Sequence, residues 1–149
     1  MFYRLALISS FVLVNYYCLT TSALAEVTFK NVLPGTLEPT GTEMKVLQSL
    51  TPVTLIVNVP ENRNAQITIL PPTSASSPSE DPNGTTRVGF LKFGSTNLRS
   101  DNSDNTKNIA NLPTGNTVLE VGMRVQRPVA FSPGTYNYSL NLSVTITPP

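Results

Sequence analysis

The chain has 149 residues, of which 13% are charged and 40% hydrophobic, with no His, no Trp and one Cys. This length fits one domain, and the low charge with this hydrophobic content argues against a disordered polyelectrolyte. The formal net charge of +1 argues against nucleic acid as a partner, because binding to phosphates needs a basic surplus.

The first 25 residues have the pattern of a secretory signal peptide. Arg4 supplies the positive charge, residues 5–14 form the apolar segment, and residues 23–25 (Ala-Leu-Ala) are a small-x-small cleavage site. A transmembrane anchor is the alternative, but it needs about 20 apolar residues, and Asn15 interrupts the run. The pattern predicts an exported chain (periplasmic, cell-surface or extracellular) with no stable membrane span after cleavage.

Cleavage would leave a single domain over residues 26–149. Cys18 would be removed, so the mature domain would have no disulfide and no thiol site. One of the ten basic residues, Arg4, would also be removed, and the remaining nine balance the nine acidic residues to zero net charge. Subtracting 25 from 149 leaves 124 residues, enough to bury one core without staples.

Alternating apolar and polar residues then predict a succession of β-strands. The N-terminal candidates are residues 26–29, 52–59 and 65–69, and the connection 60–64 has the length of a hairpin loop. Residues 42–50 fit either two turns of helix or a strand at 45–47.

Three further strands are predicted in the C-terminal half. Residues 87–93 are apolar on both faces, as is typical of the middle of a sheet, and residues 118–126 place four apolar side chains on one face. Residues 135–147 alternate over thirteen positions, with Tyr, Leu, Val and Ile on one face and only Thr, Asn and Ser on the other. This last run is far longer than the usual strand of about five or six residues.

Two polar stretches, 71–86 and 94–108, are predicted to be loops. Both exceed the about four to six residues typical of a compact domain, so each is either functional or disordered. If functional, each is a candidate binding loop. The charged pairs Glu80-Asp81 and Arg124 with Arg127 are interpreted as solvated surface.

Six to eight strands at this spacing predict an all-β fold, an antiparallel β-sandwich that is immunoglobulin-like or pilin-like, with an open barrel as the alternative. The core is expected to include four of the phenylalanines: Phe29, Phe90, Phe93 and Phe131.

The composition excludes the common catalytic centres. Without His, and without Cys in the mature domain, there is no Ser-His-Asp triad, no Cys-His pair and no typical zinc site. The polar residues at 101 and 103–105 offer oxygens to calcium, but the loop lacks the required spacing and the Gly and Glu of a calcium loop. Composition leaves a Ser-Lys dyad or a carboxylate pair open, but nothing in the sequence places either. The sequence therefore predicts no enzyme, with no catalytic residue, no metal and no cofactor. Three N-x-S/T sequons, at Asn83, Asn137 and Asn141, match the number expected by chance.

The C-terminal stretch Phe131-Ser132-Pro133-Gly134-Thr135-Tyr136, with the alternating tail that follows it, resembles the ending of the secreted spore coat protein U family and of the related archaic chaperone–usher pilins. In these proteins a G-x-Y turn leads into a long final strand. The resemblance covers Gly134, Tyr136 and the alternating tail only. It implies an immunoglobulin-like subunit that is exported through the inner membrane and assembled into surface fibres by strand exchange.

Two hypotheses of function follow. The first is a structural or adhesive cell-surface component, pilin-like, that pairs with itself or with other surface subunits through edge strands. Its core strand would be 136–146, and residues 26–32 would be the candidate donor segment. The second is a monomeric periplasmic or extracellular binding module that uses the loops 71–86 and 94–108.

Overall fold

The computed structural model describes residues 27–33, 35–101 and 108–147, and the predicted signal peptide lies outside these ranges. Within them every regular element is a β-strand, and no helix is present that could span a membrane. The strands in chain order are β1 (Thr28–Leu33), β2 (Thr36–Thr40), β3 (Val46–Thr51), β4 (Val53–Val59), β5 (Asn64–Ile69), β6 (Thr73–Ser76), β7 (Thr86–Phe93), β8 (Thr96–Arg99), β9 (Ile109–Leu112), β10 (Gly115–Gln126), β11 (Asn137–Ser139) and β12 (Leu142–Thr147).

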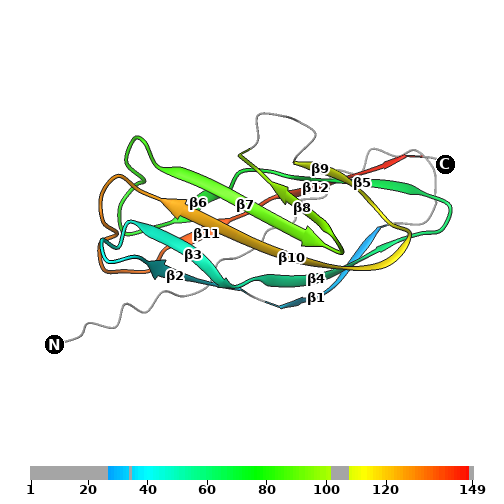
Figure 1. Cartoon of the computed structure of the whole chain (residues 1–149), viewed down its shortest axis with the longest axis horizontal. Coiled ribbons are helices and arrows are strands. Elements are labelled where there is room, and N and C mark those ends of the chain that lie inside the picture. Colours follow the sequence, from blue (N-terminus) through cyan, green and yellow to red (C-terminus); the bar gives the residue numbers. More distant parts are fainter. Residues whose placement is uncertain (1–26, 34, 102–107, 148–149) are drawn as a thin grey trace.

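All pairings between these strands are antiparallel, so the predicted all-β antiparallel class is confirmed. The larger sheet has seven strands and is built around β10 (Figure 1). One edge of β10 pairs with β4 and then with β3, and the other edge pairs with β7, which in turn pairs with β8. Beyond β3 and β4 lie β2 and β1. A second sheet has the order β12-β5-β9, and β6 pairs with β11.

Several of these strands are successive parts of one extended path. β3 and β4 follow one another along the same edge of β10. On their far side β1 lies beside β4 and β2 beside β3, so this second path runs antiparallel to the first. The Leu70 amide donates to the Asn141 carbonyl at 3.0 Å, which joins the β5–β12 ladder to the β6–β11 ladder. Joining the four interrupted paths (β1 with β2, β3 with β4, β5 with β6, β11 with β12) turns twelve strands into eight. The predicted six to eight strands therefore agree with the eight continuous paths. The interruptions within four of these paths were not predicted.

Among the described residues, 23 buried apolar side chains form one hydrophobic core between the sheets. Leu55, Val57 and Leu119 come from the larger sheet, and Ile67, Ile69 and Leu142 come from the smaller one. The sheets approach closely at Gly89 of β7, where a Cβ atom would lie 2.5 Å from Leu140 and 3.0 Å from Ile69. This arrangement is consistent with a β-sandwich.

The predicted hairpin at residues 60–64 is wrong. Both edges of β4 are occupied, by β1 and β10, and both edges of β5 are occupied, by β12 and β9. The connection therefore crosses from one sheet to the other. Loop length is the same for a hairpin and for such a crossing, so length alone could not distinguish them.

Residues 42–50 form no helix, because β3 begins at Val46 and pairs with β2 and β10. The two predicted loops are also only partly irregular. The stretch 71–86 contains β6, and the stretch 94–108 contains β8, while residues 102–107 lie outside the described ranges. Both strands are short and largely polar, which hides them from a search for apolar alternation.

The long terminal run keeps its predicted alternation, with Tyr136, Tyr138, Leu140 and Leu142 all buried. It is not one strand, because the ladder breaks between β11 and β12 and resumes against a different partner. Among the phenylalanines, Phe93 and Phe131 are buried and Phe29 packs against the core. Phe90 is an exception, since it alternates with the buried Gly89 and Leu91 and so faces outward.

Candidate functional site

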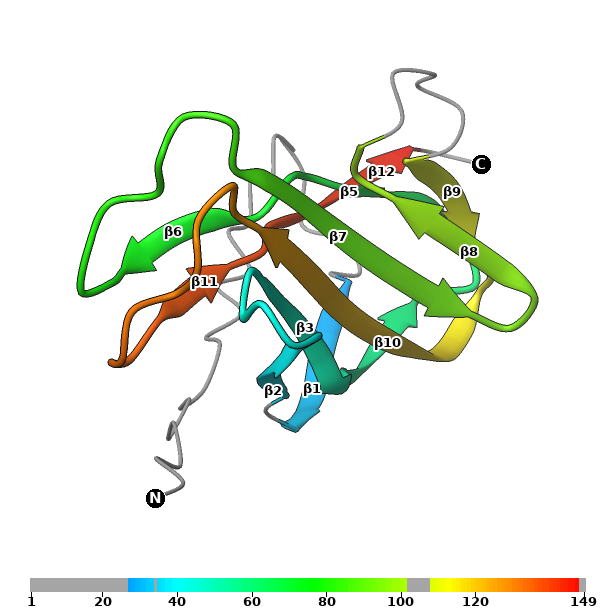
Figure 2. The ribbon, with the colours of Figure 1, turned by 60° about the vertical axis from the view of Figure 1, so that its left-hand side comes forward.

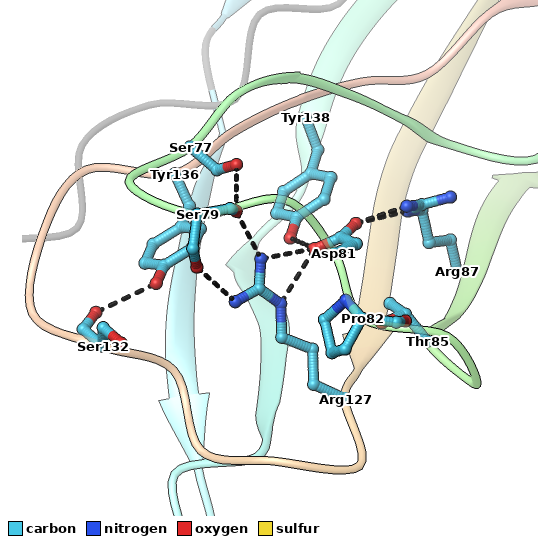
Figure 3. A network of polar contacts seen from close by, with 10 residues as sticks. All are labelled: Ser77, Ser79, Asp81, Pro82, Thr85, Arg87, Arg127, Ser132, Tyr136 and Tyr138. Atoms are coloured by element: carbon cyan, nitrogen blue, oxygen red, sulfur yellow. Dashed lines mark hydrogen bonds and ion pairs between the residues drawn. The ribbon is translucent and has the colours of Figure 1, made fainter.

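Three features of the described residues lie outside the apolar core: a buried polar cluster, a hollow on the larger sheet and an open sheet edge. The polar cluster, which we call the Asp81 clamp, consists of Asp81, Arg87, Arg127 and Tyr138 (Figure 3). Nε of Arg127 donates to Oδ1 of Asp81 at 2.8 Å, and the Tyr138 hydroxyl donates to the same oxygen at 2.9 Å. Nε of Arg87 donates to Oδ2 of Asp81 at 2.8 Å. Both carboxylate oxygens are therefore occupied by protein donors.

The clamp joins three segments that are far apart in the sequence. Asp81 lies in the β6–β7 connection, Arg127 directly follows β10, and Tyr138 belongs to β11. Arg127 also donates through Nη2 to the Ser79 carbonyl at 3.2 Å, so one guanidinium fixes two points of the connection. The clamp thus holds the β6–β7 connection against the sandwich.

Burial sets the electrostatics of the clamp. The side chains of Asp81 and Arg127 are only 3% and 2% exposed. Burial by itself raises the pKa of Asp81, but hydrogen bonds from Arg87, Arg127 and Tyr138 outweigh it and hold that pKa below its ordinary value. Burial, followed by the contact with the Asp81 carboxylate, raises the pKa of Tyr138 above its ordinary range. The carboxylate stays ionised and the phenol stays protonated at neutral pH.

Two aromatic rings enclose the guanidinium of Arg127. Its Cζ lies 4.5 Å from the ring centre of Phe131 and 4.9 Å from that of Tyr136. The two rings meet edge to face at 5.0 Å, and the Tyr136 hydroxyl donates to the Ser132 carbonyl at 3.1 Å. Cation–π contacts of this kind are strengthened by the absence of water.

The interpretation of Asp81 and Arg127 as solvated surface is wrong. A signal for Arg127 was present in the sequence, because position 127 continues the inward series of Val121, Met123 and Val125. Asp81 carried no such pattern, since it lies in a polar connection. With every oxygen of Asp81 bonded within the protein, the clamp is suited to structural support and presents no open general base.

The hollow lies on the outer face of the larger sheet and has a volume of about 420 Å³. It is open because Gly122 on β10 stands opposite Phe90 on β7 and has no side chain. Arg99 lies over the Phe90 ring at 5.3 Å, and Lys92 pairs with Glu120 at 3.5 Å. The predicted loop 94–108 contributes β8 to the wall, while the predicted loop 71–86 contributes no residue.

The open edge belongs to β12. Its six residues pair with β5 in unbroken register, from Leu142 opposite Ile69 to Thr147 opposite Asn64. Among the described residues β12 has no partner on its other side. Ser143, Thr145 and Thr147 are exposed and uncharged, and Val144 and Ile146 are half-buried against the core.

The remaining polar residues of interest do not assemble into a site. Asp101 pairs with Arg99 at 2.7 Å, and no group of three metal-ligating side chains occurs in the described ranges. The sequon residue Asn83 is exposed in a turn, whereas Asn137 lies in β11 and donates to Ser76. Comparison of the chain with protein-family models, with curated proteins and with solved structures gave no match in any of the three.

Proposed function

We propose that this chain is an exported, non-catalytic structural or adhesive component of the cell surface that joins other subunits by strand pairing. The observation that carries the proposal is the open edge of β12, a regular six-residue strand without charge and without proline. Soluble proteins usually protect such an edge with charged residues, proline, bulges or short strands, because an unprotected edge pairs with other chains.

The other edges of the described sheets have this protection. β6, β8 and β9 have four residues each, β11 has three, and β8 includes Arg99. The β1–β2 edge has a register irregularity after Lys30 and includes Glu38 and Pro39. The contrast supports β12 as the strand that is kept available for a partner.

The pairing is proposed at β12 and not at the N-terminal segment. Residues 28–32 of the expected donor segment lie in β1, which pairs with β4 of the same chain. A strand used within its own sheet is not free to complete another subunit. Assembly by addition to an existing edge requires no such release.

An immunoglobulin-like or pilin-like topology is part of this proposal. Two observations support it: the antiparallel two-sheet arrangement, and the hydrogen bond from Tyr136 to the carbonyl of Ser132 four residues earlier. A tyrosine that bonds back across a corner in this way is characteristic of sandwiches of that kind.

The proposal is tested by expressing the full chain and following both its location and its size. Fractionation of the cells should recover the protein from the surface or the periplasm, and mass spectrometry should show an N-terminus at Glu26. Light scattering should show species larger than a monomer that persist in high salt. An intracellular chain that retains residues 1–25, or a monomer at every concentration, would overturn the proposal.

A binding module is the second candidate, and the hollow around Phe90 favours it. The two basic side chains that line the hollow are both paired, Lys92 with Glu120 and Arg99 with Asp101. The hollow therefore suits a neutral polar ligand that stacks on the ring of Phe90. Replacing Gly122 with Leu would fill the hollow. Loss of ligand binding in this variant, with the oligomeric state unchanged, would favour the module over the assembly.

A further inference from the structure

We infer that the partner of the β12 edge is a second copy of this chain, in a closed dimer whose two β12 strands pair antiparallel about a two-fold axis at Val144. This inference rests on the proposed function and specifies its partner. It depends on three properties of the edge: which main-chain groups point outward, which side chains share a face, and the absence of charge.

Two hydrogen bonds determine which residues of β12 direct their main-chain amide and carbonyl groups to the open edge. The Leu70 amide donates to the Asn141 carbonyl, so the main-chain groups of Asn141 point toward the β5 side. These groups alternate along an extended strand, so those of Ser143 and Thr145 also point toward β5. The groups of Leu142, Val144 and Ile146 point to the open edge. In agreement, the Ile69 amide donates to Asn108 on the opposite side of β5 and not to its neighbour Leu142.

The open edge therefore offers three amides and three carbonyls at every second residue, with Val144 in the centre. Two such edges fit each other when Val144 stands opposite Val144 and Leu142 opposite Ile146. All six outward groups of each strand are then used, because each of these pairs exchanges both of its hydrogen bonds. A two-fold axis at Thr145 would use only the groups of Val144 and Ile146.

The side chains agree with the same register. Opposite residues in an antiparallel pair lie on one face of the sheet. Leu142, Val144 and Ile146 would meet on the inner face, where Val144 and Ile146 are only half-buried in the single chain. Ser143 and Thr145, which are exposed, would meet on the outer face. A shift of the register by one residue would place apolar side chains opposite polar ones.

Electrostatic repulsion between two β12 strands does not oppose their pairing. β12 contains no ionisable side chain, so the two-fold axis brings no like charges together. Because the same edge is used by both copies, the contact closes on itself and does not propagate into a fibre. The product would be one continuous sheet with the order β9-β5-β12-β12-β5-β9.

Disulfide trapping tests the register directly. The full chain, with Cys18 replaced by Ser, is prepared as two variants, Ser143→Cys and Thr145→Cys, which are oxidised separately and as a mixture. Residues 143 and 145 of opposite strands would have Cα atoms about 4.5 Å apart, within the range of about 4.4–6.8 Å for a disulfide. Identical residues would be diagonal neighbours at about 7–8 Å, which is too far.

The mixture is expected to give at least fivefold more cross-linked dimer than either variant alone. Equal cross-linking in all three samples, or none in any, would overturn the proposed register. Amide hydrogen exchange of the unsubstituted chain serves as a second measurement. The amides of Leu142, Val144 and Ile146 should slow at least tenfold on raising the concentration, whereas that of Thr145 should stay slow throughout.

Rapid exchange at those three amides at every concentration would also overturn the dimer. Different results would overturn the β12 dimer and the proposed function. A chain that is exported and assembled, but without the 143–145 cross-link, would overturn the β12 dimer alone. A chain that stays inside the cell would overturn the proposed function.

Discussion

Nε of Arg127 lies 2.8 Å from Oδ1 of Asp81, and the two side chains are 2% and 3% exposed, so a full ion pair is enclosed within the protein. Removing one partner of a buried ion pair costs far more than removing an exposed charge, because the other charge is left uncompensated. The clamp therefore makes the β6–β7 connection part of the cooperative structure.

Replacing Arg127 with Met should lower the free energy of unfolding by about 1.5–3 kcal/mol, since the buried Asp81 would lose hydrogen bonds from a charged donor but keep those from Arg87 and Tyr138. Urea unfolding followed by circular dichroism measures this change. The matched control is Arg124→Met on β10, where the arginine is exposed and donates to Gln126. The control should change stability by no more than about 0.5 kcal/mol, and similar losses in the two variants would contradict a stabilising clamp.

The stability of the chain should fall at acid pH through Asp81. Hydrogen bonds hold its pKa in the folded state below the ordinary value of 3.8, so folding favours the ionised form. The contribution is complete above the unfolded pKa and is lost as pH falls below about 3.8 through the folded pKa. Unfolding free energies measured from pH 6 to pH 2 should show this loss.

The variant Asp81→Asn should start from a lower stability and show a smaller decline over the same acid range. With no His in the chain, neither protein should show a side-chain titration near neutral pH. An unchanged acid decline in the asparagine variant would show that other carboxylates carry it.

Replacing Gly89 with Ala should destabilise the chain by about 1–3 kcal/mol, the usual cost of overpacking. Its Cβ would lie 2.5 Å from the buried Leu140 and 3.0 Å from the buried Ile69. Gly122→Ala on the neighbouring β10 is the control, because its Cβ would meet Ser49 at 3.4 Å, an ordinary contact. Thermal unfolding of both variants distinguishes them, and equal melting temperatures would contradict close approach of the sheets at Gly89.

Charges placed on β12 should control the affinity of the proposed dimer. In the inferred register residue 143 stands opposite residue 145 of the partner, so Ser143→Lys with Thr145→Glu creates two attractive pairs. Ser143→Lys with Thr145→Lys creates two repulsive ones. Each cross-strand pair contributes roughly 0.2–1 kcal/mol, so the two double variants should differ severalfold or more in dissociation constant at low salt. Sedimentation equilibrium measures the difference, and indistinguishable constants would count against this register.

Much of the sandwich could be predicted from alternation, and the reason is local. Residues 53–59, 118–126 and 136–146 each bury one face, so the sequence must repeat with period two. Partner choice is not encoded locally, and for this reason the length of the 60–64 connection predicts a hairpin where the chain crosses between sheets. The burial of Asp81 depends on Arg127 and Tyr138, which lie 46 and 57 residues away. A polar connection shows no pattern that reveals such a contact.

The interruptions of the strand paths lie next to one another across each sheet. The break between β1 and β2 lies beside the break between β3 and β4. The break between β5 and β6 lies beside the break between β11 and β12. Figure 2 shows β6 and β11 extending to one side and β5, β9 and β12 to the other. The interruptions therefore divide the sandwich into two ends. One end contains the Asp81 clamp, and the other contains the open edge of β12. The Asp81 clamp shares no residue with the β5–β12 ladder, so a side-chain change in the β6–β7 connection removes none of the main-chain pairing that shapes the open edge of β12.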